Sequence, residues 1–243
     1  MGSPQQAVAD KAGTQYDVIG FDADDTLWRS EDAFQAAEER FVEVLAPFTP
    51  PGIDLAAALR ETERTNLSTL GYGVKAFALS MVQCAITVSS GDVPAAAIRQ
   101  LLELGYDMLT EPVQLLPHVP EVLAEVGHDH RLLLLTKGDL VHQTRKITTS
   151  GLEHHFEYVE ILLEKDPTTY RRVLRHVGVE PERFLMVGNS VRSDILPVLE
   201  IGGSAVHVPY HVLWDHEHVD DHGEEFSELA SLADLPAWLH RAA

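Results

Sequence analysis

The stretch FDADDTLW, residues 21–28, follows the apolar run 18–20 and places three carboxylates, Asp22, Asp24 and Asp25, within four positions. A short apolar run of this kind is typical of a buried strand. A carboxylate is costly to remove from water unless a cation, a proton or hydrogen-bond donors compensate it. The end of this strand therefore requires a cation, a proton or a strong structural reason for so much negative charge.

Composition limits the classes of protein that the chain can belong to. It has 243 residues, of which 45% are hydrophobic, so a globular protein with one large domain, or a domain with a smaller insert, is expected. Its formal charge of -20 argues against a nucleic-acid binder, because that affinity depends on cationic side chains that neutralise phosphates. A small anionic substrate is still compatible, since a metal and a few lysines can meet its charge locally.

The chain has features of a cytoplasmic protein. The single cysteine, Cys84, excludes an intramolecular disulfide and favours a reducing compartment. Residues 1–14 lack the pattern of a signal peptide and are expected to be a disordered leader. No uncharged apolar stretch approaches transmembrane length, so we expect no membrane association.

Short aliphatic runs predict buried parallel strands, and helical patterns separate the later ones. The predicted strands are 16–21, 131–136, 158–163, 184–187 and 205–208. The predicted helices are 140–150, 168–177, 193–201 and a closing helix at 235–239. This alternation predicts an α/β fold with a Rossmann-like, doubly wound parallel sheet.

About ninety residues between the first two strands break this alternation. They contain helical patterns at 31–45, 54–66, 74–88 and 94–109. We therefore predict an α/β core made of 15–28 and 117–243, with an all-helical cap, 29–116, inserted above the end of the first strand.

Polar side chains follow four of the predicted strands. In an open parallel sheet, the carboxyl ends of the strands border the binding crevice. The residues at these ends are Asp22, Asp24, Thr136, Lys137, Lys165, Asn189 and Asp194. Together they offer a cation site, a hydroxyl and ammonium groups, which suit a phosphoryl group held against a carboxylate nucleophile.

Four segments, FDADDTLW, LLLLTKGD, EKDPTTY and MVGNSVRSDI, resemble the ordered motifs of the haloacid dehalogenase superfamily. The resemblance covers about residues 16 to 209. Phosphatases of this superfamily share a core sheet and an aspartate nucleophile, and one subclass has a helical cap between the first two motifs.

The resemblance implies a role for each matching residue. Asp22 would attack phosphorus and form an aspartyl phosphate, and Asp24 would protonate the leaving oxygen and later activate water. Thr136 and the backbone N–H of Lys137 would bind phosphate oxygens. Lys165 would neutralise the phosphate and orient Asp22.

The resemblance also implies a Mg²⁺ site. Its ligands would be Asp22, the backbone carbonyl of Asp24, Asn189 and Asp194, completed by water. Many relatives have aspartate where this chain has Asn189, and an amide oxygen can still bind a hard cation at reduced charge.

Two further departures concern neighbouring positions. Many relatives have glycine where this chain has Asp25, to which we assign no catalytic role. In a common family pattern the lysine of the third motif is followed by Pro-Asp-Pro, whereas Asp166 and Pro167 follow Lys165 directly.

Two segments outside these motifs are candidates for substrate or metal binding. The stretch GYGVK, residues 71–75, could form a loop over the site that places Tyr72 or Lys75 beside the leaving group. A simple helix-helix turn with a solvated lysine is an equally probable interpretation. The tract 207–222 contains His216, His218 and His222, which could bind zinc, although their spacing favours a solvated loop.

We therefore expect a Mg²⁺-dependent phosphomonoester hydrolase that acts on a small soluble metabolite. A dehalogenase of the same superfamily is an alternative, but it needs no acid at Asp24. A non-catalytic binding or scaffold protein is suggested by Asn189 and the shortened third motif, and a phosphotransferase is also compatible. The sequence leaves the substrate and the oligomeric state open.

Overall fold

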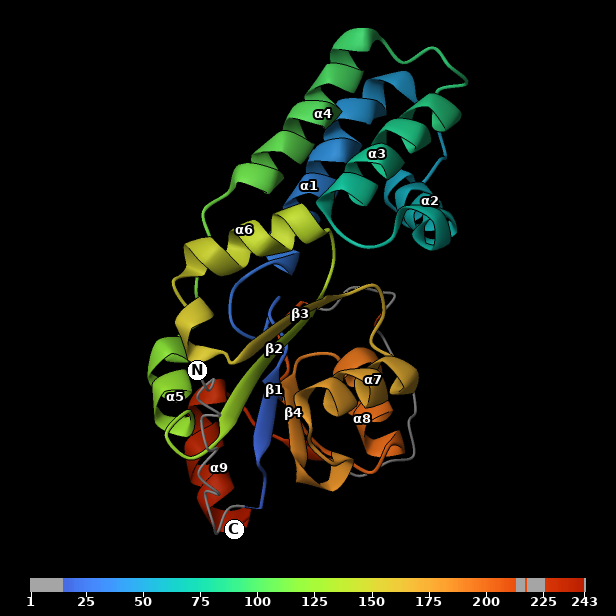
Figure 1. Ribbon diagram of the computed structural model, residues 1–243. Coiled ribbons are helices and arrows are strands. Elements are labelled where there is room, and N and C mark those ends of the chain that lie inside the picture. The colour runs from blue at the N-terminus through green and yellow to red at the C-terminus, as the bar shows by residue number, and fades with distance from the viewer. Residues whose placement is uncertain (1–14, 213–216, 218–225, 243) are drawn as a thin grey trace, which may run out of the picture.

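The computed structural model describes residues 15–212, 217 and 226–242, so the predicted leader, 1–14, lies outside the described residues. A parallel six-stranded sheet forms the core, with the strand order β3-β2-β1-β4-β5-β6 (Figure 1). The strands are β1 (Val18–Phe21), β2 (Arg131–Lys137), β3 (Tyr158–Leu162), β4 (Phe184–Gly188), β5 (Ser204–His207) and β6 (Ser227–Glu228).

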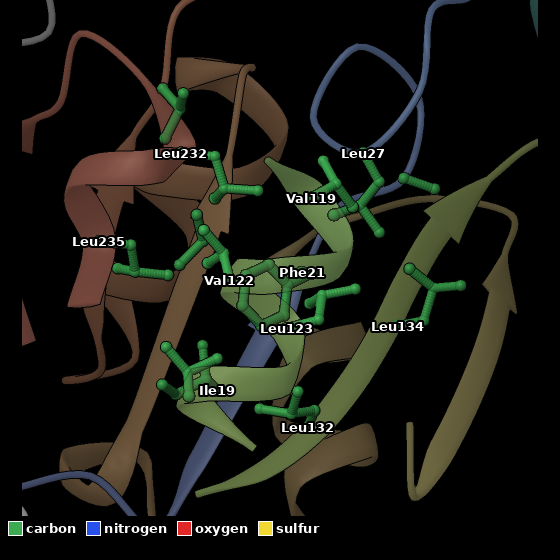
Figure 2. Packing of buried hydrophobic residues seen from close by; sticks show 14 of the residues in the cluster. Ile19, Phe21, Leu27, Val119, Val122, Leu123, Leu132, Leu134, Leu232 and Leu235 are labelled. Carbon is green, nitrogen blue, oxygen red and sulfur yellow. The ribbon is translucent and has the colours of Figure 1, made fainter. Parts of the chain in front are cut away.

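Helices cover both faces of this sheet, which confirms the predicted doubly wound α/β fold. On one face lie α5 (Val119–Val126), α6 (Leu140–Ser150) and α9 (Leu235–Ala242), and on the other lie α7 (Pro167–Val177) and α8 (Leu196–Glu200). Figure 2 shows the first layer, where Val122 and Leu123 of α5 pack near Ile19 and Phe21 of β1. Each face buries its own apolar cluster, so the strands are covered on both sides, as parallel strands require.

A helical insertion follows β1, as predicted. Its helices α1 (Glu31–Leu45), α2 (Leu55–Leu70), α3 (Val74–Val88) and α4 (Ala95–Thr110) form a bundle beyond one end of the sheet (Figure 1). The bundle has an apolar core of its own, which includes Phe41, Leu59, Phe77, Met81 and Leu101. We call α1–α4 the cap.

The two segments that join the cap to the sheet lie side by side. The N–H of Arg29 donates to the carbonyl of Gln114 at 2.9 Å, and the N–H of Leu116 donates to the carbonyl of Leu27 at 2.9 Å. The chain therefore leaves and re-enters the core through one paired ribbon, 27–29 with 114–116. The predicted division at 28/29 and 116/117 falls within or beside this ribbon and stays a prediction.

Two elements differ from the sequence prediction. Helix α5 lies within the predicted core, 117–243, and packs on the sheet, but the sequence analysis predicted no helix there. Strand β6 has two residues and exists through its pairing with Val206 and His207, which local sequence does not reveal. No helix in the described ranges is long and apolar enough to cross a membrane.

The topology locates the crevice of the sheet. The chain runs outward from β1 to β2 and β3, then returns to place β4 on the opposite side of β1. Such a reversal of strand order opens a crevice at the carboxyl ends of the strands. The cap lies over the same end of the sheet (Figure 1).

Candidate active site

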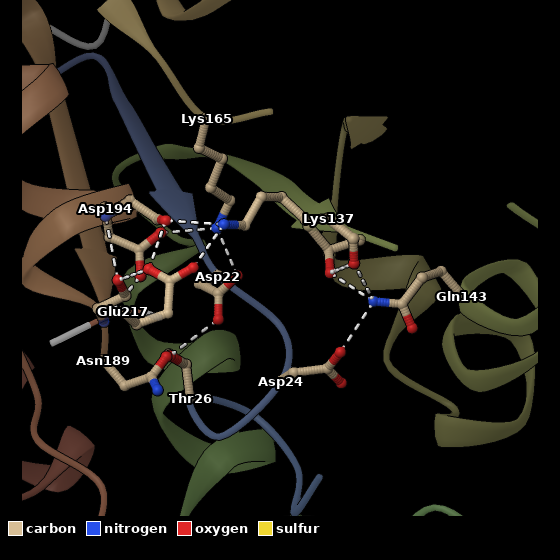
Figure 3. A network of polar contacts seen from close by, with 12 residues as sticks. Asp22, Asp24, Thr26, Lys137, Gln143, Lys165, Asn189, Asp194 and Glu217 are labelled. Atoms are coloured by element: carbon tan, nitrogen blue, oxygen red, sulfur yellow. Dashed lines mark hydrogen bonds and ion pairs between the residues drawn. The ribbon is translucent and has the colours of Figure 1, made fainter. Parts of the chain in front are cut away.

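The predicted nucleophile, Asp22, lies one residue beyond β1 at this reversal point. Its N–H donates to the carbonyl of Val187 at 2.9 Å, so the ladder to β4 holds its backbone. The ammonium of Lys165 bonds to Oδ1 of Asp22 and lies 2.6 Å from Oδ1 of Asp194 (Figure 3). The structure thus brings together three side chains from three different motifs, all of them buried.

The charges in this group are strongly coupled. Burial raises the pKa of Asp22, and the charge of Asp194 adds to this effect, while Lys165 opposes it. The two carboxylates raise the pKa of Lys165 against the opposing effect of burial, so Lys165 is cationic. One ammonium between two buried carboxylates leaves negative charge that a further cation would stabilise.

Lys165 reaches Asp22 although its motif is shorter than the common pattern. Asp166 is the N-cap of α7 and accepts from the N–H of Thr169 at 2.7 Å, and Pro167 is the first residue of the helix. Proline suits this position because its missing N–H would have no partner in the first turn. The shortened motif therefore starts a helix without displacing the lysine.

Asp194 is held by the loop after β4. It lies in one turn of π-helix, Val191–Ile195, and its Oδ2 accepts from the N–H of Ser190 at 3.0 Å. A Cβ on Gly188 would lie 2.2 Å from the same Oδ2, so only glycine allows this close approach.

Asn189 faces a group of oxygen atoms. One terminal atom of its amide lies 3.1 Å from the carbonyl oxygen of Asp24, 3.2 Å from Oγ1 of Thr26 and 3.2 Å from Oδ2 of Asp22. If that atom is the nitrogen, the amide donates hydrogen bonds to them. If it is the oxygen, three ligand oxygens converge at about the 3 Å spacing of neighbouring ligands around Mg²⁺.

Three of the predicted ligands, Asp22, the carbonyl of Asp24 and Asn189, lie together, which fits a cation site. Asp194 instead contacts Lys165 and the N–H of Ser190. Within the described part of the chain, no group of three His, Cys, Asp or Glu side chains could hold a metal by itself. The predicted ligand set is different in kind, because it includes an amide and a backbone carbonyl. A divalent cation there would also offset the negative charge around Asp22.

Asp24 accepts hydrogen bonds from three side chains. Its Oδ1 accepts from Trp28 Nε1 at 2.6 Å and from Lys146 Nζ at 2.5 Å, and its Oδ2 accepts from Gln143 Nε2 at 2.9 Å. Burial opposes ionisation here, but Lys146 and the other donors outweigh it and hold the pKa of Asp24 below its usual value. These three donors hold the carboxylate of Asp24 in a fixed orientation.

Thr136 and Lys137 lie at the end of β2, as predicted. The hydroxyl of Thr136 accepts from Gln143 Nε2 at 2.7 Å. The ammonium of Lys137 lies 2.8 Å from Oγ of Ser193 and 4.3 Å from the centre of the Tyr72 ring. Both residues line the same cavity as Asp22, and the side chain of Lys137 extends to Ser193 and the Tyr72 ring.

Sequence reasoning missed Glu217. Its carboxylate lies 2.6 Å from Lys137 Nζ, and it accepts from the hydroxyls of Ser190 and Ser193 (Figure 3). Burial works against its ionisation, yet Lys137 and the hydroxyls lower the pKa of Glu217 to about 2. Glu217 belongs to no motif, and it lies in a tract with several other acids, so the sequence did not indicate which of them would reach the site.

The structure gives Asp25 a role that the sequence left unexplained. Its backbone has a positive φ of 61°, and its carboxylate accepts from the N–H groups of Ser30 and Glu31 at 2.8 and 3.1 Å. Burial and the charge of Asp24 raise the pKa of Asp25 to about 7. Asp25 therefore fixes the start of α1 to the loop that follows β1.

The cap loop 71–75 reaches the core. Tyr72 donates its hydroxyl hydrogen to Glu164 at 2.6 Å, and Lys75 pairs with Asp139 at 2.9 Å. Tyr72 also lines a cavity of about 310 Å³ between the cap and the strand ends. Both candidate specificity residues therefore link the cap to the core, and Tyr72 lies in the cavity wall as well.

The cavity has walls of different chemistry. Its core side includes Asp22, Asp24 and the lysines 137, 146 and 165, whereas its cap side includes Phe34, Phe77, Glu31 and Glu63. The predicted zinc ligands His216, His218 and His222 lie outside the described residues. His207, the first histidine of that tract, instead contacts the carbonyl of Asn189 at 3.0 Å.

Gln143 and Lys146 were also missed as site residues. They follow Thr136 by seven and ten residues and lie on one face of α6, since residues three apart are neighbours on a helix. A helical pattern after the second motif contained that signal. Trp28 is fully buried and also donates to Asp24.

The chain has a parallel sheet, a helical cap after the first strand, and acids and a lysine at the strand ends. This arrangement is typical of hydrolases that use an aspartate nucleophile. The family model for haloacid dehalogenase-like hydrolases matches residues 16–202. The chain belongs to this family of hydrolases.

Two curated relatives are phosphatases. A glyceraldehyde 3-phosphate phosphatase of Methanothermobacter thermautotrophicus is 30% identical over 112 residues, which cover 44% of this chain and 50% of the relative. A phosphoserine phosphatase of Thermus thermophilus is 36% identical over 101 residues, which cover 38% and 41%. The chain thus spans half or less of the curated relatives it matches.

Solved structures match over more of the chain. A haloacid dehalogenase-like hydrolase from Xanthomonas campestris is 38% identical, with a TM-score of 0.85, covering 95% of this chain and 93% of that one. A Bacillus subtilis hydrolase, whose structure contains bound magnesium, is 17% identical with a TM-score of 0.63, covering 93% and 99%, and so shares the fold.

Proposed function

We propose that this chain is a Mg²⁺-dependent phosphomonoester hydrolase acting on a small soluble metabolite through an aspartyl-phosphate intermediate. The observation that carries the proposal is the placement of Asp22, with one oxygen on Lys165 and the other facing Asn189. The phosphatase activities of the two curated relatives support it.

The reaction has two steps. Asp24 first takes up a proton. An oxygen of Asp22 then forms a bond to phosphorus as the bond to the ester oxygen breaks, and Asp24 gives its proton to that oxygen. Asp24 then takes a proton from water, which attacks phosphorus and releases inorganic phosphate and free Asp22. Each proton therefore passes through the same carboxylate.

Other residues of the site bind the phosphoryl group. The hydroxyl of Thr136, the N–H of Lys137 and the ammonium of Lys165 offer donors on the side of Asp22 facing β2 and α7. Mg²⁺, held by Asp22, the carbonyl of Asp24, Asn189 and Asp194, would neutralise phosphate charge when bound. The cap, for which we propose the bounds 29–116, would cover the substrate and exclude bulk water.

Asp24 also bears on the dehalogenase alternative. Attack on a carbon-halogen bond expels a halide, which needs no proton, so a dehalogenase has no use for a fixed carboxylate at this position. The three donors that orient Asp24 favour the phosphatase.

The free, buried thiol of Cys84 is consistent with a protein that functions in a reducing compartment such as the cytoplasm.

The first test is release of p-nitrophenol from its phosphate ester, with Mg²⁺ or with EDTA. We expect Mg²⁺-dependent turnover in the wild type, its loss in Asp22→Asn, and its retention in Asp129→Asn, a matched change at an exposed aspartate. A panel of metabolite phosphates follows, because a cap can reject a generic ester. A wild type inactive on the whole panel across divalent metals would favour a binding protein.

A further inference from the structure

The side chain of Lys146 is built into the site although it belongs to none of the four motifs. It projects from α6, is 12% exposed, and lies 2.5 Å from Oδ1 of Asp24. Its ammonium also lies 6.0 Å from the centre of the Trp28 ring, at the limit of a cation-π contact. The burial of most of the Lys146 side chain and its contact with the Trp28 ring distinguish this pair from an exposed ion pair, whose geometry is loosely held.

The two oxygens of Asp24 are held unequally. Oδ1 accepts from both Lys146 and Trp28, at 2.5 and 2.6 Å. Within the described residues, Oδ2 accepts only from Gln143, at 2.9 Å. The Nε2 of Gln143 also lies 2.7 Å from Thr136 Oγ1 and 2.8 Å from the carbonyl of Lys137, so its two hydrogens serve three acceptors. Oδ2 is therefore the less constrained oxygen.

From this geometry we propose that Lys146 is the positioning residue of Asp24, fixing Oδ1 so that Oδ2 carries the proton to and from the reacting oxygens. The inference rests on the proposed phosphatase function. Asp24 takes up a proton on Oδ2 before the first step. That proton moves to the leaving oxygen as its bond to phosphorus breaks, and a proton from water moves to Oδ2 in the second step. Lys146 stays on Oδ1 throughout and does not touch the substrate.

A positioning role of this kind has a kinetic signature. An alcohol leaving group needs a proton as its bond to phosphorus breaks, whereas p-nitrophenolate is stable without one. Misplacing Oδ2 should therefore impair the cleavage of alkyl phosphates more than the cleavage of p-nitrophenyl phosphate. A change that only loosened the fold would slow both substrates alike.

The test compares kcat/KM of glycerol 2-phosphate, phenyl phosphate and p-nitrophenyl phosphate at saturating Mg²⁺. In Lys146→Met we expect a loss of about tenfold to a hundredfold for the alkyl ester and below about threefold for the nitrophenyl ester. Lys146→Arg should restore most of the alkyl activity, and Trp28→Phe should show the same pattern more weakly. Arg145→Met, an exposed neighbour on α6, should change neither ester.

Several results would overturn the proposal. If Lys146→Met lost activity equally on all three esters, or on none of them, Lys146 would not position Asp24. The proposed phosphatase function would still stand. If the Met variant loses its circular dichroism signal, Lys146→Gln carries the same comparison. A wild type that cleaves none of the esters or the wider panel would remove the proposed function and this inference with it.

Discussion

Lys165 lies between two buried carboxylates, in contact with Oδ1 of Asp22 and 2.6 Å from Oδ1 of Asp194. A buried ammonium shared by two acids compensates both, and neither acid has another cationic side chain in contact within the described residues. The ammonium of Lys165 thus contributes both to the stability of the protein and to the proposed reaction.

Replacing Lys165 should therefore destabilise the protein as well as inactivate it. Lys165→Met leaves two buried acids without their cation, and we expect a loss of about 3–5 kcal/mol in the free energy of unfolding. Urea denaturation at neutral pH measures it. The double variant Lys165→Met with Asp194→Asn should recover part of the loss, because it removes one of the stranded charges; additive losses would contradict this coupling.

Asn189 offers a test of the cation site. Asn189→Asp adds a charge beside Oδ2 of Asp22 and the carbonyl of Asp24, so we expect Mg²⁺ to bind about tenfold more tightly and the metal-free protein to melt at a lower temperature. Isothermal titration calorimetry and thermal melts with EDTA measure the two effects. Asn189→Leu, which offers no oxygen, should bind Mg²⁺ more weakly than the wild type. Three equal affinities would remove Asn189 from the site.

Glu63 in the cavity wall should make stability depend on pH. Burial and the charge of Glu38 raise the pKa of Glu63 to about 7, with Arg60 opposing, from an ordinary value of 4.5. Between these values the folded protein keeps a proton that the unfolded chain releases, so stability falls as the pH rises.

Glu63→Gln cannot ionise and should lose this dependence. Its melting temperature relative to the wild type should increase by on the order of 3–6 °C between pH 5 and pH 8. Differential scanning calorimetry at both values measures the difference. Glu39→Gln, at an exposed site on α1, is the matched control and should shift little. A Glu63→Gln difference that stayed constant with pH would contradict the prediction.

Tyr72 and Lys75 should differ in their effects on specificity. Lys75 is engaged by Asp139, so Lys75→Ala should raise KM a few-fold for every ester and leave the substrate ranking unchanged. Tyr72 lines the cavity, so Tyr72→Ala should change the ranking. Tyr72→Phe keeps the ring and removes only the bond to Glu164, and should resemble Lys75→Ala. Relative kcat/KM values over a phosphate-ester panel separate these outcomes.

The sequence predicted those parts of the fold that depend on the local periodicity of apolar residues. Helices α1, α3 and α6 have the predicted bounds, because an apolar stripe with clear ends defines each of them. The crevice could be located as well, since it follows from the ends of parallel strands. Strand β6 could not be predicted, because two residues are too few to show an alternating pattern.

The positions of the motif residues were predictable. Asp22, Lys165 and Asp194 meet as the ordered motifs imply. The partners of Asp24 were not predictable, because a glutamine and a lysine on an amphipathic helix read as surface residues until the helix is placed over the strand ends. Asp25 shows the same limit, since its acceptor role depends on a turn with positive φ.

The ribbon formed by 27–29 and 114–116 has a consequence for how this molecule can change over generations. Because the cap departs and returns at one place, a single exchange at that point replaces the whole bundle without rearranging any strand of the sheet. The cap, which we propose covers the substrate, can thus be inherited, lost or replaced as one piece, while Asp22 and Lys165 stay in place.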